Sequence, residues 1–126
     1  MKPFSPARHT VVDVLFCIAT ACAPSVLGFG GLPAIVCYWI AGGYFVFSML
    51  TNTPLAPLRV IPFRVHRGVE IVAGLGLIAL PWLLRFQEND RAKWFFVGAG
   101  IVTFIVFALT DWREEPKRMK AEVHPA

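Results

Sequence analysis

Four long apolar runs divide the chain, and short polar segments separate them. The runs cover about residues 10–29, 32–51, 67–86 and 93–111. Each run is close to the ~20 residues that a helix needs to cross a hydrocarbon core of ~30 Å. Short turns join the runs in two pairs, and a longer segment with three prolines, residues 52–66, separates the pairs because proline interrupts a helix. The pattern predicts an all-α, integral membrane four-helix protein built from two hairpins.

The composition supports a membrane protein and excludes several soluble classes. Charged residues make up 16% of the 126 residues, against ~25% in ordinary soluble domains. Residues 10–57 contain one acid, Asp13, and neither Lys nor Arg. A small soluble domain could not cover its surface with so little charge. We therefore exclude an ordinary soluble enzyme, a disordered tail and a nucleic-acid binder, and we expect the lipid bilayer to be the first partner.

The distribution of basic residues predicts the orientation. With four spans, nine of the twelve Lys and Arg residues lie on the side of the two tails and the linker. The other three are Arg85, Arg91 and Lys93. The positive-inside rule then puts both termini in the cytoplasm, with residues 113–126 as a charged cytoplasmic tail. Pro24 follows Ala21-Cys22-Ala23 directly and opposes signal-peptide cleavage there, so we expect the first span to remain in the protein.

The two halves of the chain align at an offset of 57 residues. Between residues 9–53 and 66–110 this gapless alignment gives eight identities in 45 positions. It places His9 on His66, Asp13 on Glu70 and Pro24 on Pro81. We therefore interpret residues 1–126 as a single membrane domain of two tandem repeats joined by residues 54–65. Because each repeat has two spans, the copies enter the membrane from the same side and should be related by a pseudo-two-fold axis along the membrane normal.

The segments around the two matched prolines resemble a known family. Ala23-Pro24-Ser25 and Leu80-Pro81-Trp82 each share part of a Ser-Pro-Trp signature. In these segments the chain resembles the SPW-repeat family of small bacterial membrane proteins, whose repeat has two membrane helices with the signature late in the first. The resemblance covers roughly residues 9–112. It implies the hairpin architecture and a multi-pass protein of the bacterial inner membrane, and it implies no activity.

Several small and aromatic residues predict how the helices end and pack. Pro24 and Pro81 should kink their helices just before each turn, because proline removes a helical hydrogen bond. Glycines in the last three spans should let helices approach closely. They are Gly42, Gly43, Gly74, Gly76, Gly98 and Gly100. The phenylalanines of the fourth span should face lipid or another copy. They are Phe95, Phe96, Phe104 and Phe107.

The candidate chemistry lies in the pairs His9-x₃-Asp13 and His66-x₃-Glu70. A spacing of four places both side chains of a pair on one helix face. In one interpretation the acids stabilise the helix N-terminus near the headgroups, where water solvates them, and Thr10-x-x-Asp13 forms a capping box. In the other, the pseudo-two-fold axis brings the pairs together, and they bind a metal ion or relay protons.

Two function hypotheses follow, and we expect neither a cofactor nor catalysis. The chain lacks a phosphate loop, a CxxC motif and a Ser/His/Asp set. The first hypothesis is a structural or accessory subunit that packs against itself or other integral membrane proteins. The alternative is a small ion- or proton-handling protein that uses His9, Asp13, His66 and Glu70. Convergence of these four side chains would favour the second hypothesis.

The charge distribution makes a testable prediction of topology. Single cysteines replace Asn89 or Lys120 in a Cys-free background, and an impermeant thiol reagent is added to intact cells. We expect labelling at Asn89, in the turn with few basic residues, and none at Lys120. Labelling at Lys120 alone would invert the orientation.

Overall fold

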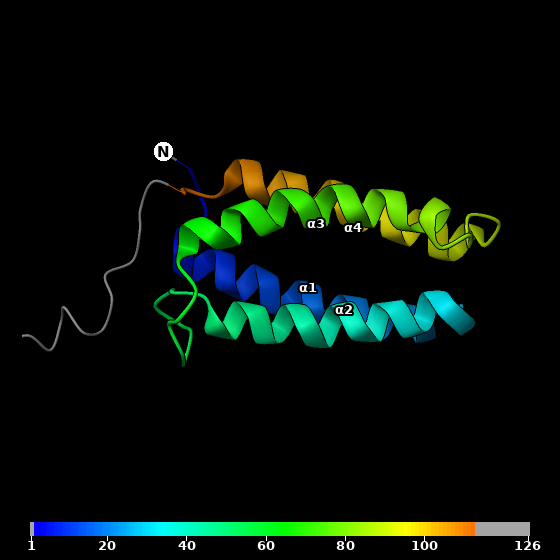
Figure 1. Ribbon diagram of the computed structural model, residues 1–126, viewed down its shortest axis with the longest axis horizontal. Coiled ribbons are helices and arrows are strands. Elements are labelled where there is room, and N and C mark those ends of the chain that lie inside the picture. Colours follow the sequence, from blue (N-terminus) through cyan, green and yellow to red (C-terminus); the bar gives the residue numbers. More distant parts are fainter. Residues whose placement is uncertain (1, 113–126) are drawn as a thin grey trace, which may run out of the picture.

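A computed structural model of the chain describes residues 2–112 and contains four helices in two hairpins (Figure 1). The helices are α1 (Pro6–Leu27), α2 (Gly31–Leu50), α3 (Phe63–Leu83) and α4 (Asp90–Leu109). α1 pairs with α2 and α3 pairs with α4. The N-terminal segment, residues 51–62 and the end of α4 lie at one end of the bundle, and the two short turns lie at the other. The predicted all-α, four-helix membrane fold is confirmed, whereas the charged tail at 113–126 lies outside the described residues.

Three of the helices have the length and apolar composition of a membrane span: α1, α2 and α4. α3 does not meet the same criterion, and its first two turns carry Arg64, Arg67 and Glu70. It nevertheless lies alongside α4 over its length. That α3 forms the fourth span therefore stays a prediction.

Helices α1 and α3 each begin four residues earlier than the hydropathy pattern predicts. Ser5 caps α1 by accepting a hydrogen bond from the backbone N–H of Arg8, and Pro6 takes the first helical position. Proline suits that position because its missing N–H would have no helical partner there. As a result His9 and His66 lie one full turn inside their helices.

The matched prolines lie in the last turns of α1 and α3. The Pro24 carbonyl accepts hydrogen bonds from Gly28 and Phe29, and the Pro81 carbonyl accepts one from Phe86. Gly28 and Arg85 both take a left-handed conformation, with φ of 73° and 59°. The two helix ends are thus built alike, while the predicted kinks stay a prediction.

The residue offset that relates the two hairpins is different before and after their turns. α1 begins at 6 and α3 at 63, an offset of 57, whereas α2 begins at 31 and α4 at 90, an offset of 59. Counted from Phe29 and Phe86, which both donate to the carbonyl of the matched proline, the second hairpin has two extra residues before its second helix begins. The gapless alignment is wrong for the second helix of each pair, because it ignores this insertion. The orientation of the pseudo-two-fold axis stays a prediction.

Backbone pairing closes the end of the bundle that carries the N-terminus. The N–H groups of Val60 and Ile61 donate to the Leu50 carbonyl at 2.9 and 2.8 Å, which satisfies the last turn of α2. Phe4 does the same for α4, donating to the Leu109 carbonyl at 3.1 Å. Such pairing matters in a membrane, where an unsatisfied carbonyl is costly.

The closest helix contact is between α3 and α4. A Cβ placed on Gly100 would lie 2.7 Å from the Gly74 carbonyl oxygen and 2.5 Å from Ile78, and one on Gly74 would meet Phe104 at 2.9 Å. The other four glycines predicted to allow close packing have open space at the same position. Phe96, expected to face lipid or another copy, is instead fully buried because it packs against Phe86 within the second hairpin.

We predict that Gly100→Ala weakens the second hairpin. The added methyl group would overlap backbone as well as a side chain, and overpacking of this kind typically costs ~1–3 kcal/mol. Thermal unfolding in detergent should show a lower midpoint. Gly98→Ala, two residues away with open space around its Cβ, is the matched control and should match the wild type. Equal midpoints for both variants would contradict the packing described.

Candidate functional site: a buried histidine and carboxylate centre

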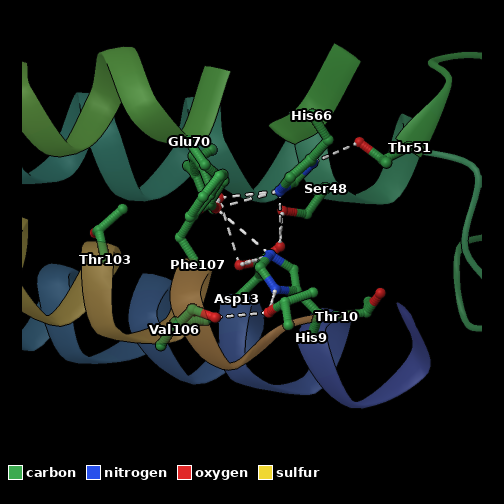
Figure 2. Close-up of polar contacts among 12 residues, drawn as sticks. His9, Thr10, Asp13, Ser48, Thr51, His66, Glu70, Thr103, Val106 and Phe107 are labelled. Carbon is green, nitrogen blue, oxygen red and sulfur yellow. Dashed lines mark hydrogen bonds and ion pairs between the residues drawn. The ribbon is translucent and has the colours of Figure 1, made fainter. Parts of the chain in front are cut away.

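The structure brings all four predicted side chains together. His9 and Asp13 come from α1, and His66 and Glu70 come from α3 (Figure 2). One ligand-capable atom of each lies within 4.8 Å of all the others. Their exposed fractions are 1%, 5%, 1% and 2%, so all four side chains are buried. We call these four residues the His/carboxylate centre.

The ring nitrogens that face the centre are the Nε2 atoms. His9 Nε2 lies 3.3 Å from Asp13 Oδ1 and 3.5 Å from Glu70 Oε1. His66 Nε2 lies 3.2 Å from Asp13 Oδ2 and 3.3 Å from Glu70 Oε1. Each imidazole therefore contacts the carboxylate of its own helix and that of the other hairpin, which links the two hairpins through the centre.

Two threonines fix the opposite side of each imidazole. Thr51 donates its hydroxyl proton to the Phe47 carbonyl at 2.8 Å, and Thr110 donates to the Val106 carbonyl at 2.7 Å. His66 Nδ1 lies 2.9 Å from Thr51 Oγ1, and His9 Nδ1 lies 2.8 Å from Thr110 Oγ1. Because each hydroxyl proton is already used, the hydroxyl accepts from an Nδ1–H group. A neutral imidazole then turns the lone pair of Nε2 towards the centre.

When the imidazoles are neutral, the lone pairs of both Nε2 atoms face the negative charges of the Asp13 and Glu70 carboxylates. Asp13 and Glu70 are the only acids within the stretches 10–57, 68–84 and 94–110, and these stretches contain no Lys or Arg. His9 Nε2 is buried and makes no hydrogen bond within the described structure. Two carboxylates in such surroundings need positive charge between them, because burying unpaired charge is very costly. Protons on the imidazoles or a bound cation can supply it.

Helix α2 adds two hydroxyl donors to the carboxylates. Ser48 donates to Asp13 Oδ2 at 3.1 Å. Tyr44 donates to Asp13 Oδ1 at 3.4 Å and also lies in hydrogen-bond contact with Glu70. The sequence analysis missed these two residues and both threonines. A threonine at the end of each second helix, at matching positions, is the one signal that the sequence offered.

Aromatic rings cover the side of the centre nearest the termini. Phe63 is fully buried and stacks on Trp112, with ring centroids 4.6 Å apart. Trp112 in turn contacts the ring of His9 at 4.9 Å, and Phe47 stacks on His66 at 4.8 Å. These rings separate the imidazoles from the end of the bundle.

Two predictions about these residues are wrong. Thr10 does not cap α1, because the helix already begins at Pro6. The Thr10 hydroxyl instead lies 3.0 Å from the Pro6 carbonyl oxygen and 2.8 Å from Thr53 Oγ1. The four charged or titratable groups are also not solvated near the headgroups. They are buried, because they lie one and two turns inside their helices and face the other hairpin.

Comparison with known proteins identifies one family. The family model of the SPW repeat domain matches residues 7–111, which include both hairpins and the whole centre. No curated protein and no solved structure matches the chain.

The hydrogen bond from Ser48 gives a testable prediction. Ser48→Ala leaves Asp13 without its 3.1 Å donor, and interhelical hydrogen bonds in membrane proteins contribute about 0.6–1.7 kcal/mol. We expect the free energy of unfolding in mixed micelles to fall by about 1 kcal/mol. The exposed Ser25→Ala is the control and should leave it unchanged. An equal loss of unfolding free energy in both variants would show that the hydrogen bond to Asp13 is not the cause.

Proposed function

The chain belongs to the SPW repeat family, and we propose that it is a non-enzymatic, ion-handling membrane protein that binds a divalent transition-metal cation at the His/carboxylate centre. The observation that carries the proposal is the convergence of two imidazole Nε2 atoms and two carboxylates within 4.8 Å in a buried site. A divalent cation would balance the charge of both carboxylates and accept both lone pairs at once.

The spacing of the candidate ligand atoms fits a metal. Zinc bonds to imidazole nitrogen and carboxylate oxygen measure ~2.0–2.2 Å, so ligand atoms of a tetrahedral site lie roughly 3.4 Å apart. Four N···O distances of the centre, 3.2–3.5 Å, are near that separation, with Asp13 Oδ1 next to His9 and Oδ2 next to His66. All four candidate ligand atoms lie within 4.8 Å of one another, so a bound metal would draw them closer together. Two nitrogens and two oxygens also suit zinc, iron, manganese or cobalt better than calcium or magnesium, which prefer oxygen alone.

The surroundings of the imidazoles support the same proposal. A metal-binding histidine commonly donates its other N–H to a fixed acceptor, which sets the tautomer and the ring orientation. Thr51 and Thr110 serve as such acceptors here.

We place the protein in the bacterial inner membrane as a multi-pass protein with both termini in the cytoplasm. The twelve basic residues support this orientation, because nine of them fall on the side of the termini in a four-span arrangement. The centre then lies at the cytoplasmic ends of the helices.

A structural or accessory role is the second candidate. Its support is a pair of exposed glycines on α2, Gly42 and Gly43, which pack against nothing in the described structure. Small residues on a membrane helix allow another helix to approach closely, in a second copy or in another membrane protein.

Metal analysis of the purified protein tests the first proposal. After loading with Zn²⁺ or Co²⁺ and gel filtration, we expect about one metal ion per wild-type chain, because one centre offers four ligands. The double variant His9→Gln/His66→Gln should fold, as judged by helical circular dichroism and elution volume, and should retain less than about a tenth of the metal.

A matched control removes acids outside the centre. The double variant Glu88→Gln/Asp90→Asn changes one acid between α3 and α4 and the first residue of α4, both outside the centre, and should bind metal like the wild type. Co²⁺ bound in the wild type should show the visible absorption of a four-coordinate site. A wild type that binds no metal, or a histidine variant that binds it undiminished, would overturn metal binding and favour the accessory role.

A further inference from the structure

A cavity of about 760 Å³ lies between the two hairpins and reaches the His/carboxylate centre. At one end it is lined by Asp13, Tyr44 and Glu70, and along its length by apolar side chains of all four helices. Trp94 and Phe95 also line it. Trp94 lies twelve residues before Val106, another lining residue, so the cavity extends about 18 Å along the helices. Cavities of this volume hold drug-sized molecules.

At the carboxylate end of the cavity the polar side chains offer hydrogen-bond acceptors, whereas Trp94, at the other end, carries an indole N–H donor. Thr20 donates its proton to the Phe16 carbonyl, and Thr103 donates to the Ala99 carbonyl. Tyr44 uses its proton on the carboxylates. Asp13 and Glu70, when ionised, can only accept. A ligand head group beside Asp13, Tyr44 and Glu70 is therefore favoured when it donates hydrogen bonds.

The charge at the polar end selects a cation. The described residues that line the cavity include two carboxylates and no Lys or Arg. A positive head group placed there gains attraction in surroundings where water screens little. The imidazoles lie on the far side of the carboxylates, between them and the rings of Phe63 and Trp112, and do not line the cavity. The cavity is thus the side from which a ligand reaches Asp13 and Glu70.

From these observations we propose that the cavity binds a lipophilic organic cation with an N–H donor, such as a long-chain primary amine. The ammonium group lies against Asp13, Tyr44 and Glu70, and the hydrocarbon chain extends towards Trp94. This inference goes beyond metal binding and does not require it. The ammonium and a divalent cation compensate the same two carboxylates, so each weakens the binding of the other.

Binding of radiolabelled dodecylamine tests the proposal. The full chain is placed in phosphatidylcholine nanodiscs, and binding is measured by scintillation proximity against empty nanodiscs. Unlabelled dodecylamine should compete. Dodecyltrimethylammonium, which lacks an N–H donor, dodecanol, which lacks the charge, and dodecanoate, which reverses it, should each compete on the order of tenfold less well or worse. Equal competition by all four would mean that bilayer acyl chains fill the cavity, and it would overturn the proposal.

Two glycines in the cavity wall allow a variant that fills the cavity without touching the centre. Gly76 and Gly98 line the cavity, and a Cβ on either would meet open space. Gly76→Leu and Gly98→Leu should each lower dodecylamine affinity by on the order of tenfold or more, while Zn²⁺ binding persists. Gly68→Leu, on α3 outside the cavity and equally open, is the matched control and should bind dodecylamine like the wild type.

The polar end is tested separately. Asp13→Asn and Glu70→Gln should abolish the preference for dodecylamine over dodecanol. If either variant fails to fold, the glycine variants still decide the question. Unchanged dodecylamine binding in both glycine variants would overturn the proposal. It would also be overturned if the wild type were a dimer and Gly98→Leu made it a monomer while its dodecylamine affinity stayed the same. Because metal content is measured in the same samples, failure of amine binding and failure of metal binding are distinguishable.

Discussion

Two carboxylates and two imidazoles, buried between helices whose middle stretches carry no other charged residue, are the constraint on which this fold depends. A buried carboxylate is tolerated only when hydrogen bonds and positive charge compensate it. Asp13 receives the hydroxyls of Ser48 and Tyr44, and both imidazoles contact both carboxylates. Since α1 and α3 each contribute one histidine and one acid, neither hairpin can complete the centre alone. The same groups that could hold a ligand also fix the hairpins against each other.

The threonines at the ends of α2 and α4 show how the termini of the helices serve the centre. Thr51 and Thr110 are the C-caps of their helices, and each hydroxyl bonds the carbonyl four residues earlier. That bond commits the hydroxyl proton and turns the oxygen into an acceptor for Nδ1–H. A capping residue thereby determines which nitrogen of each histidine faces the carboxylates. The tautomer and orientation of the two imidazoles therefore depend on the residues that cap α2 and α4.

Much of the fold and part of the site could be predicted from the sequence, and the failures have physical causes. Hydropathy located four helices, and the spacing of four placed each histidine beside its acid. The Ser5-Pro6 start of α1 was overlooked, so the histidines were expected in the first turn, where water would reach them. The gapless offset of 57 failed after Phe86. In the second helix of each hairpin and its cap, the offsets of 57 and 59 each match three identical residues, so residue identity alone does not distinguish them. With the wrong offset Thr53, rather than Thr51, pairs with Thr110. Tyr44 and Ser48 carried no signal, since hydroxyls on a membrane helix are common.

The offset of 59 also shows how the second helices of the two hairpins differ beside the centre and the cavity. At an offset of 59, Tyr44 and Ser48 of α2 correspond to Thr103 and Phe107 of α4. The first hairpin therefore supplies both hydroxyl donors to the carboxylates, and the second supplies none at these positions (Figure 2). In the same comparison Trp39 corresponds to Gly98 and Tyr44 to Thr103, so α4 has the smaller side chain at these two positions of the cavity wall. The first hairpin thus supplies the hydroxyl donors to the carboxylates, and Gly98 and Thr103 of the second border the cavity. A symmetric pair of hairpins with a tyrosine at both positions would place a second phenol ring where Thr103 now borders the cavity.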